Sequence, residues 1–458
     1  MSVKITLTID SQARLSGTNR IRPDIPRRIK NRLSFPNPKY LDARNRGFST
    51  WNLPEYIQCY EMDGSSMIVP RGFTRQLIGI LNESGAQFEI RDHRRRLPDV
   101  EYQFFGELKG FQEEAVKAIL SREFGTLAAP TGSGKTVMAL AVIAHRKQPA
   151  LVIVHTKELL NQWCERIETF LGIPREEIGI IVAGKKTIGE KVTVGIVKSV
   201  YPIAHEIKKH FGFLIVDECH HAPARTFTEA AVEFDSLYML GLSATPYRRD
   251  KLTRLIYWHL GDMVHEIDKT ALEDSGDVLK AEAIIRETGF ASAFDPIEQY
   301  SLMLSELTKN HSRNMLIVQD VIEEAQNGGG ICLVLTDRKA HCETLAGLLE
   351  DKGIQADILT GDLSDTDRKT VVERLNTGRV KVLVATGQLI GEGFDCKELS
   401  TLFLTCPIKF SGRLLQYLGR VLRPAPGKEK ARVYDYVDSR IGVLENAARG
   451  RQKVYFGE

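Results

Sequence analysis

Residues 128–136 read AAPTGSGKT, and the rest of the chain is organised around this stretch. It lies between an apolar approach, residues 126–129, and a run typical of a helix, residues 137–145. A glycine-rich turn at a helix start directs several backbone N–H groups to one point, where the helix dipole also favours negative charge. The stretch therefore predicts a phosphate-binding loop, although Ala129 stands where the strict pattern has glycine. An ordinary glycine-rich turn is the alternative.

Two side chains at the end of this stretch suit a nucleotide. Lys135 would supply a positive charge for the β- and γ-phosphates, and the Thr136 hydroxyl would ligate Mg²⁺. ATP and Mg²⁺ are therefore the expected cofactors. The residues expected around the phosphates are Thr131, Gly132, Ser133, Gly134, Lys135 and Thr136.

Composition restricts the class of protein. A chain of 458 residues is too long for one ordinary core, so two to four domains are expected. No stretch approaches 18 uninterrupted apolar residues, and the N-terminus lacks the apolar core of a signal peptide, so no membrane partner is expected. Seven scattered cysteines without a CxxC pair indicate reduced thiols and a cytoplasmic setting, with no zinc or iron–sulfur site.

The formal charge is unevenly distributed. The overall value is +3, but residues 1–100 alone carry +7 and the remainder carries −4. A basic module upstream of a nucleotide-binding part suggests a polyanionic partner. The alternative is a solvated basic face, which charge alone does not exclude.

The first hundred residues read as a small basic α+β domain. Residues 2–10 alternate like a strand. Residues 20–46 are rich in Arg and Lys and contain four prolines, so extended segments and loops are expected there instead of a continuous helix. Cations interleaved with aromatic residues can follow phosphates and stack on bases. The same aromatic side chains could instead form the core of a small domain, and we expect Phe48 and Trp51 to belong to that core.

From residue 106 the pattern changes to short apolar runs that alternate with helical stretches. This rhythm is typical of a parallel, doubly wound sheet, and it occurs twice. The predicted fold is α/β: two tandem parallel-sheet lobes preceded by the small basic domain. The expected limits are 1–100 for the basic domain, 101–269 for the first lobe and 270–458 for the second.

Acidic and hydroxyl side chains follow two of the apolar runs. FLIVDECHH, residues 213–221, predicts a buried strand that delivers Asp217 and Glu218 at its carboxyl end, where ligands of parallel sheets bind. In an ATPase the first would hold Mg²⁺ and the second would deprotonate the attacking water. GLSATP, residues 241–246, places the Ser243 and Thr245 hydroxyls at another strand end. Surface turns are the alternative for both stretches.

The second lobe contributes QYLGRVLR, residues 416–423. Gln416, Gly419, Arg420 and Arg423 recur at spacings that share one helical face. Two arginines presented together suit a phosphate, and an arginine finger stabilises a phosphoryl transition state. A basic amphipathic surface helix is the alternative.

The ordered motifs resemble the core of a superfamily 2 helicase or translocase. DECH indicates a DEXH-type member. Within the superfamily the chain is most similar to the XPB-like group of DNA helicases, which includes the phage recombination helicase UvsW. The matching stretches span roughly residues 105–436 and are LKGFQ (108–112), APTGSGKT (129–136), VHTKELLNQW (154–163), GIVKSV (195–200), DECHH (217–221), LSATP (242–246), TGQLIGEGFD (386–395) and QYLGRVLR (416–423).

This resemblance implies RecA-like lobes and a role for each residue at a matching position. In the nucleotide site, Gln112 would recognise adenine beside Phe111, Gly393 and Asp395 would lie near the ribose, and Gln416 would assist Arg420 and Arg423 at the γ-phosphate. His220, Ser243 and Thr245 would couple nucleotide state to the second lobe. The residues implied to touch the nucleic-acid backbone are Thr156, Lys157, Ser199, Thr360 and Thr386.

The resulting hypothesis is an ATP-dependent DNA helicase or translocase that acts on duplex, forked or branched DNA. Family members carry Arg-Glu-Asp where this chain reads Arg248-Arg249-Asp250, which favours translocation or branch remodelling over processive unwinding. An RNA helicase and a nucleotide-switched scaffold are alternatives. A further alternative is the motor of a restriction or repair complex, which would need nuclease, repair or recombination partners.

Overall fold

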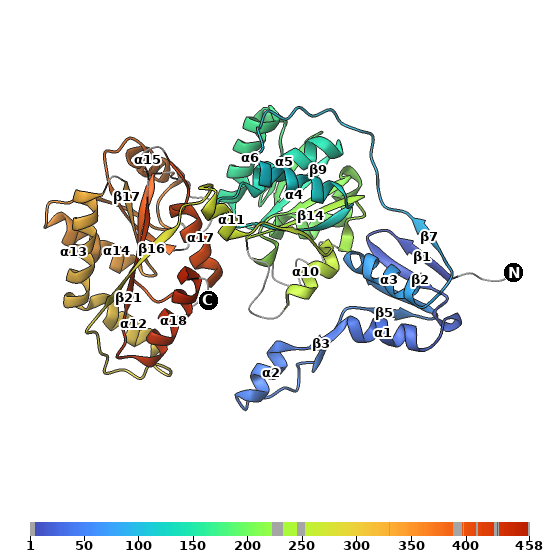
Figure 1. Ribbon diagram of the computed structural model, residues 1–458, viewed down its shortest axis with the longest axis horizontal. Coiled ribbons are helices and arrows are strands. Elements are labelled where there is room, and N and C mark those ends of the chain that lie inside the picture. The colour runs from blue at the N-terminus through green and yellow to red at the C-terminus, as the bar shows by residue number, and fades with distance from the viewer. Residues whose placement is uncertain are drawn as a thin grey trace. The chain divides into compact units, whose positions relative to one another are not determined.

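The computed structural model describes residues 5–221, 232–244, 252–328, 330–387, 396, 398–408, 411–425, 428 and 430–456, without the side chains of 221, 365, 411–413, 415, 416 and 456. The chain forms two compact units (Figure 1). The first comprises Met1–Ala129 and Gly134–Ile267, and the second comprises Asp268–Glu458 with Pro130–Ser133. The three domain limits expected from the sequence stay a prediction.

The first unit begins with a five-stranded sheet in the order β5-β6-β2-β1-β7. Every second residue of β1 and β2 is buried, as alternation in the sequence predicts. A two-stranded ribbon, β3 with β4, stands apart from this sheet. The elements are β1 (Ile5–Ile9), β2 (Gln12–Ser16), α1 (Asp24–Arg32), β3 (Ser34–Pro36), α2 (Pro38–Asn45), β4 (Tyr56–Gln58), β5 (Glu61–Asp63), β6 (Ser66–Pro70), α3 (Thr74–Glu83) and β7 (Phe88–Asp92).

Two helices occupy the proline-rich segment, so the expectation of loops there was wrong. Pro26 is the third residue of α1, and Pro38 is the first residue of α2. Backbone N–H groups in the first turn have no partner within the helix, so proline removes nothing there. The Asn37 side chain caps α2 by accepting from the Lys39 N–H. The prolines therefore mark helix starts.

The expected core role of two aromatic residues was also wrong. Trp51 is 92% exposed and Phe48 is 66% exposed. The core of this domain instead consists of aliphatic residues from β1, β2, α1 and α3, together with Phe35 and Phe73. Local spacing does not distinguish an aromatic residue that reaches the core from one on a projecting loop.

The N-terminal domain packs tightly on the first lobe. Trp258 of α10 (Thr253–Leu260) belongs to its core and contacts the ring of Phe73. A Cβ on Gly72 would lie 2.5 Å from the backbone of Tyr257 and of Gly261, so the two chain segments meet backbone to backbone. This close approach requires glycine at position 72.

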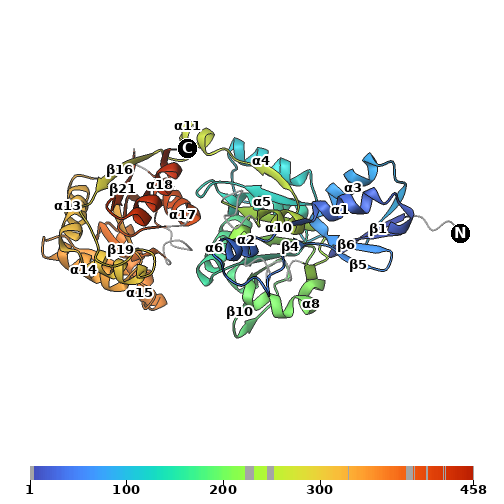
Figure 2. The same cartoon turned by 90° about the horizontal axis from the view of Figure 1, so that it is seen from below.

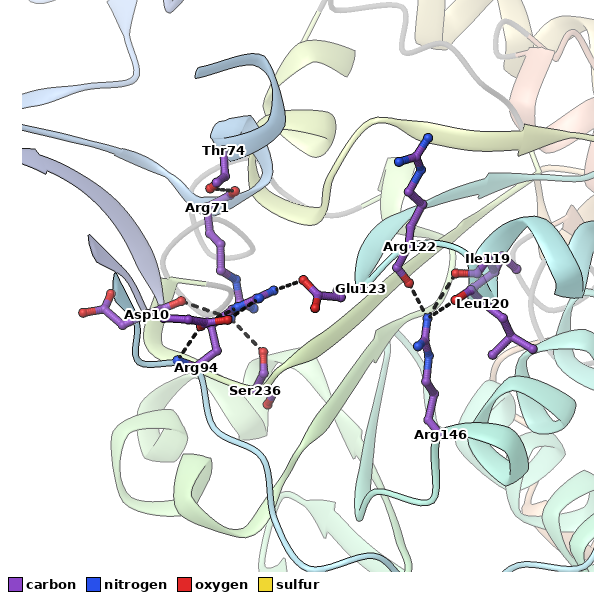
Figure 3. A network of polar contacts seen from close by, with 11 residues as sticks. Asp10, Arg71, Thr74, Arg94, Ile119, Leu120, Arg122, Glu123, Arg146 and Ser236 are labelled. Carbon is purple, nitrogen blue, oxygen red and sulfur yellow. Dashed lines mark hydrogen bonds and ion pairs between the residues drawn. The ribbon is translucent and has the colours of Figure 1, made fainter. Parts of the chain in front are cut away.

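Buried polar contacts reinforce the same interface (Figure 3). The Arg71 guanidinium donates to the carbonyl oxygens of Asp10 (3.1 Å) and Ser236 (2.8 Å), so it joins the two sheets. Burial, and then the nearby charge of Arg94, lowers the pKa of Arg71 to about 9. Arg94 bridges Asp92 of β7 and Glu123, which precedes β8 of the first lobe.

The first lobe is an eight-stranded sheet in the order β11-β10-β12-β9-β13-β14-β8-β15, parallel except for β11. Its central strands are apolar throughout, because helices cover both faces. The strands are β8 (Phe124–Ala128), β9 (Ala150–Val154), β10 (Gly179–Val182), β11 (Lys185–Lys186), β12 (Val192–Ile196), β13 (Phe213–Val216), β14 (Tyr238–Ser243) and β15 (Met263–Glu266); the helices are α4 (Gly110–Leu120), α5 (Lys135–Arg146), α6 (Lys157–Leu171), α7 (Val197–Val200) and α8 (Ala204–Ile207).

The second lobe is a six-stranded parallel sheet in the order β16-β21-β20-β17-β19-β18. Helices α13 and α14 pack on one side around Val334 and Phe403. The elements are α11 (Lys269–Asp274), β16 (Ala281–Glu287), α12 (Tyr300–Lys309), α13 (His311–Asn327), β17 (Ile331–Thr336), α14 (Lys339–Glu350), β18 (Ala356–Leu359), α15 (Asp365–Asn376), β19 (Val382–Thr386), β20 (Leu399–Leu404), α17 (Ser411–Val421), β21 (Ala431–Val437) and α18 (Gly442–Phe456). The two predicted parallel-sheet lobes are therefore confirmed.

No helix in the described part of the chain is long and apolar enough to cross a membrane. The seven cysteines all fall within described residues and are free thiols.

Candidate nucleotide site

The glycine-rich loop joins β8 to α5, where the sequence placed it, and its binding of phosphate stays a prediction. Gly132 (φ 93°) and Gly134 (φ 85°) adopt the left-handed conformation, which side-chain-bearing residues rarely adopt. A Cβ on Gly134 would also lie 2.5 Å from Gln112 Nε2, but this atom ends a flexible side chain, so the positive φ is what requires glycine at position 134. Inside the loop, the Ser133 hydroxyl donates to the Pro130 carbonyl at 2.7 Å. The loop therefore has the backbone geometry that presents consecutive N–H groups to an anion.

Lys135 begins α5 and reaches back across the loop. It is buried, and its Nζ donates to the Ala129 carbonyl at 3.0 Å. The same Nζ lies 3.9 Å from Glu218 Oε1. The predicted cation and the predicted base thus lie beside each other, although 83 positions separate them in the sequence.

The acidic pair follows β13. Asp217 is buried, and its two carboxylate oxygens accept from Trp163 Nε1 (2.8 Å) and from the Glu218 N–H (2.9 Å). Burial, and then the adjacent Glu218 charge, raises the pKa of Asp217 to about 6. Glu218 has φ 46°, an unusual value for a residue with a side chain. Such strain often occurs where a functional side chain must hold one direction.

A histidine and a serine connect this pair to the next strand. His220 Nδ1 lies 3.0 Å from Ser243 Oγ and 3.3 Å from Glu218 Oε2. Ser243 ends β14 and pairs in register with Ala128, the last residue before the phosphate loop. The side chains of Lys135, Glu218, His220 and Ser243 therefore form one connected cluster at the carboxyl edge of the sheet. Thr245, predicted to act with them, lies outside the described residues.

The donor set suits a magnesium–nucleotide complex. Mg²⁺ is usually held by one or two carboxylates, nucleotide phosphates and water. Asp217 supplies a carboxylate, Thr136 supplies a hydroxyl in the first turn of α5, and the glycine-rich loop supplies the phosphate cradle. Among the described residues, no group of three or more His, Cys, Asp or Glu side chains is placed to hold a metal ion without a ligand's help.

The residues expected at the base belong to α4. Gln112 is buried; its Oε1 accepts from the Lys109 N–H at 3.0 Å, and its Nε2 faces Gly134. Gln112 therefore joins the start of α4 to the phosphate loop. Phe111 is half-buried next to it. Their contact with adenine stays a prediction.

The arginines of the second lobe are only partly as expected. Arg420 is buried in α17, which ends at Val421, so Arg423 lies two residues beyond the helix, and its action together with Arg420 stays a prediction. Pro424 explains the early end, because it has no N–H for the helix ladder and disfavours helical geometry at Arg423. Lys428 Nζ donates to the Val421 and Arg423 carbonyls just beyond the end of the helix. Burial lowers the pKa of Lys428 to about 8. Gly393, Asp395 and the Gln416 side chain lie outside the described residues.

The predicted nucleic-acid contacts all follow strands of the two sheets. Thr156 follows β9, Ser199 follows β12, Thr360 follows β18 and Thr386 ends β19. Each therefore lies at the carboxyl edge of its own sheet, where ligands of parallel sheets bind. The Thr156 hydroxyl also caps α6 by accepting from the Leu159 N–H at 3.3 Å. Lys157, the first residue of α6, is exposed.

Sequence reasoning missed Trp163. It is fully buried in α6 and donates to the carboxylate of Asp217, so it positions that group. A buried tryptophan usually needs a partner for its N–H, and a strand-end carboxylate was already expected nearby. The need for a hydrogen-bond acceptor was the only feature of the sequence that pointed to a role for Trp163, and it does not identify Asp217 as the acceptor.

Two family models match the chain. Residues 106–248 match the model described as type III restriction enzyme, res subunit, and residues 313–425 match the helicase conserved C-terminal domain. The chain is 28% identical over 350 residues to DNA 3'-5' translocase XPB2 of Sulfurisphaera tokodaii, covering 69% of this chain and 79% of that protein. It is 27% identical to Probable helicase D10 of Escherichia phage T5, covering 71% and 70%.

The fold also matches a solved helicase structure. Saccharomyces cerevisiae Dbp5 bound to RNA and ADP BeF3 superposes with a TM-score of 0.55 at 16% identity, covering 77% of this chain and 88% of that one. At this identity the likeness concerns the fold alone. It agrees with the two parallel-sheet lobes described above.

Proposed function

We propose that this chain, which resembles the XPB-like group of superfamily 2 helicases, hydrolyses ATP to move along or remodel duplex or branched DNA. The observation that carries the proposal is the cluster of Lys135, Asp217 and Glu218 at the phosphate loop. A cation, a buried carboxylate and a strained glutamate at one sheet edge suit phosphoryl transfer to water.

The residues divide the chemistry of hydrolysis among them. The loop N–H groups and Lys135 would bind the β- and γ-phosphates, and Asp217 with Thr136 would hold Mg²⁺, which neutralises developing charge when bound. Glu218 would orient and deprotonate the attacking water. Arg420 and Arg423 would stabilise the transferring phosphoryl group from the second lobe.

The proposal of DNA over RNA rests on two supports. The matching protein of Sulfurisphaera tokodaii is named a DNA translocase, and the first hundred residues carry a net charge of +7. Contacts to the nucleic-acid backbone carry little sequence information, so binding should tolerate sequence changes and weaken in salt. Translocation or branch remodelling is favoured over processive unwinding, because Arg249 stands in place of the family's glutamate. Residues 248–250 lie outside the described ones.

We also propose a reducing, cytoplasmic setting, which the seven free thiols support. Roles in DNA repair or recombination would bring partner proteins, and a nuclease is one such partner. The proposed setting rests on the free thiols and the proposed partners rest on the family resemblance. Neither affects the outcome of the ATPase assay.

The deciding experiment is a steady-state ATPase assay with no nucleic acid, single-stranded DNA, blunt duplex, forked DNA and RNA. Lys135→Ala serves as the blank, because it removes the phosphate-binding cation. We expect the fork or duplex to stimulate wild-type hydrolysis most strongly. Stimulation by RNA alone would assign the protein to RNA helicases, and a rate indifferent to every nucleic acid would refute coupled translocation.

A further inference from the structure

The loop between β3 and β4 projects from the N-terminal domain as a separate arm. The arm, residues 37–55, contains α2, which lies away from the five-stranded sheet in both views (Figures 1 and 2). Its base is closed by the pairing of β3 with β4 and by Asn37. Asn37 is buried; its side chain donates to the Pro54 carbonyl at 2.9 Å, and its N–H donates to the Glu55 carbonyl at 2.8 Å.

Exposed apolar side chains gather on this arm. Of the twelve large hydrophobic residues that are exposed in the described structure, Leu41, Phe48 and Trp51 belong to the arm, and Tyr56 lies at its base. Trp51 is 92% exposed and Phe48 is 66% exposed. A single exposed apolar side chain is common, but a cluster of them marks an interaction surface, so a ligand that covers the arm is the expected reason for this group.

The arm is also ordered internally. The Phe48 N–H donates to the Ala43 carbonyl at 2.8 Å, and the Leu53 N–H donates to the Thr50 carbonyl at 2.9 Å. The first contact closes the C-terminal end of α2 at Phe48, and the second closes the following turn, residues 50–53, which contains Trp51. A preformed turn loses less conformational entropy when a ligand binds.

The charges of the arm favour a nucleic acid. Lys39 and Arg44 are exposed, and neither forms an ion pair with any described residue. Arg46 pairs with Asp42 at 3.0 Å, which neutralises the acidic side chain nearest to them. Unpaired cations beside exposed aromatic rings are the combination that binds a phosphate backbone and stacks on unpaired bases.

We infer that the arm binds unpaired bases of the DNA substrate, with Trp51 and Phe48 as the stacking platform and Lys39 and Arg44 on the adjacent phosphates. This inference rests on the proposed function and specifies the substrate as DNA with a single-stranded region. A closed duplex keeps its bases stacked inside, so the arm distinguishes a fork from a blunt duplex. The N-terminal domain is fixed to the first lobe through Gly72 and Arg71, so the base of the arm is held on that lobe.

The chain contains its own reporter for this contact. It has three tryptophans, and Trp163 and Trp258 are only 1% and 4% exposed. Iodide should therefore quench Trp51 almost alone. We expect oligothymidylate and a forked DNA to protect this emission from iodide, whereas a blunt duplex should not.

Substitution gives the second measurement. Trp51→Ala and Phe48→Ala should each weaken binding to oligothymidylate and to the fork by about tenfold, because one stacked base contributes on the order of 1.4 kcal/mol, or a factor of ten. Binding to the blunt duplex should change less than threefold. Ile297→Ala, which removes a 78% exposed side chain from the second unit, is the matched control and should change neither.

Three outcomes would overturn the inference. One is unchanged iodide quenching while the fork is bound. Another is an equal loss of affinity for fork and blunt duplex, which would indicate general electrostatics. The third is protection from iodide that grows with protein concentration without DNA, which would assign the arm to a second copy of the chain. Failure of the proposed function is separate, because there the wild-type ATPase would ignore every nucleic acid.

Discussion

A single hydrogen bond distinguishes two buried tryptophans. Trp163 donates to Asp217, whereas Trp258 packs against Phe35 and Phe73. Trp163→Phe removes a donor from a buried carboxylate, so we expect the free energy of unfolding to fall by about 2 kcal/mol. Because Asp217 is proposed to hold Mg²⁺, kcat of the ATPase should also fall about tenfold, equivalent to about 1.4 kcal/mol in the barrier. Denaturant unfolding and ATPase assays measure the two effects.

Trp258→Phe is the control for that substitution. It removes the same indole ring from a site where no described acidic side chain accepts a hydrogen bond from it, so it should destabilise the fold and leave kcat within twofold of wild type. Equal kcat values for the two variants, measured where both are folded, would contradict a positioning role for Trp163.

Two buried histidines make the stability of the protein sensitive to acid. Burial, and then the charge of Arg313, lowers the pKa of His341 to about 3. Burial also lowers the pKa of His259 to about 4. His341 Nδ1 lies 2.7 Å from Thr336 Oγ1 and Nε2 lies 3.0 Å from Asn314 Oδ1, a pairing that suits the neutral ring. The unfolded chain, with a histidine pKa of about 6.5, binds protons that the folded chain does not.

Stability from these histidines is therefore complete above about pH 6.5 and decreases as the pH falls towards 4. The expected slope is about 1.4 kcal/mol per pH unit for each histidine within that range. Denaturant unfolding at pH 7.5, 6 and 5 measures it. In His341→Gln, the free energy of unfolding should change less steeply with pH than in wild type, by the contribution of one histidine, whatever the stability of the variant at pH 7.5. An identical slope in the two proteins would show that His341 is protonated in the fold.

At the scale of elements, the contact between the N-terminal domain and α10 depends on one glycine. Gly72→Ala would place a methyl group 2.5 Å from the backbone of Tyr257 and Gly261, and backbone cannot move aside as a side chain can. We expect a loss of about 3 kcal/mol in stability. Thermal unfolding should show it as a lower Tm.

Gly79→Ala is the matched substitution within the same domain. Gly79 lies in α3 and a Cβ there meets nothing within 4 Å, so alanine should raise stability by about 1 kcal/mol through helix propensity. A Gly72→Ala variant as stable as Gly79→Ala would mean that the domain and α10 separate readily in solution.

The elements also show where sequence reasoning works. Apolar runs such as Leu151–Val154 and Phe213–Val216 predicted the central strands, because a strand covered on both faces is mostly apolar. Pro26 and Pro38 misled the prediction, because proline is tolerated in a first turn and the local sequence does not say which turn it occupies. The exposure of Trp51 depends on the arm leaving the domain, which no local pattern encodes.

The candidate site was predictable where its residues are local in sequence. Lys135, Asp217 and Ser243 each follow an apolar strand, so topology brings them to one edge. Long-range partners were not predictable in the same way. Trp163 reaches Asp217 only through the packing of α6. The end of α17 before Arg423 was, by contrast, readable from Pro424, which disfavours helical geometry at the residue before it.

At the scale of the whole molecule, the residues proposed to bind ATP and the residues proposed to bind DNA come from both compact units. Lys135 and Lys157 belong to the first unit, and Arg420 and Thr386 belong to the second. If ATP and DNA each need residues of both units, each ligand contributes to the free energy required to bring the units into one arrangement. The second ligand then binds more tightly than it does alone.

We therefore predict reciprocal coupling between a non-hydrolysable ATP analogue and oligothymidylate. Each should raise the affinity of the other by the same factor, about 5- to 150-fold, because linkage makes the coupling free energy of about 1–3 kcal/mol common to both. Titration calorimetry in both orders measures it, with Lys135→Ala as the variant that should lose it. An analogue affinity that DNA leaves unchanged would show that the two units bind their ligands independently, and translocation would then need another source of coupling.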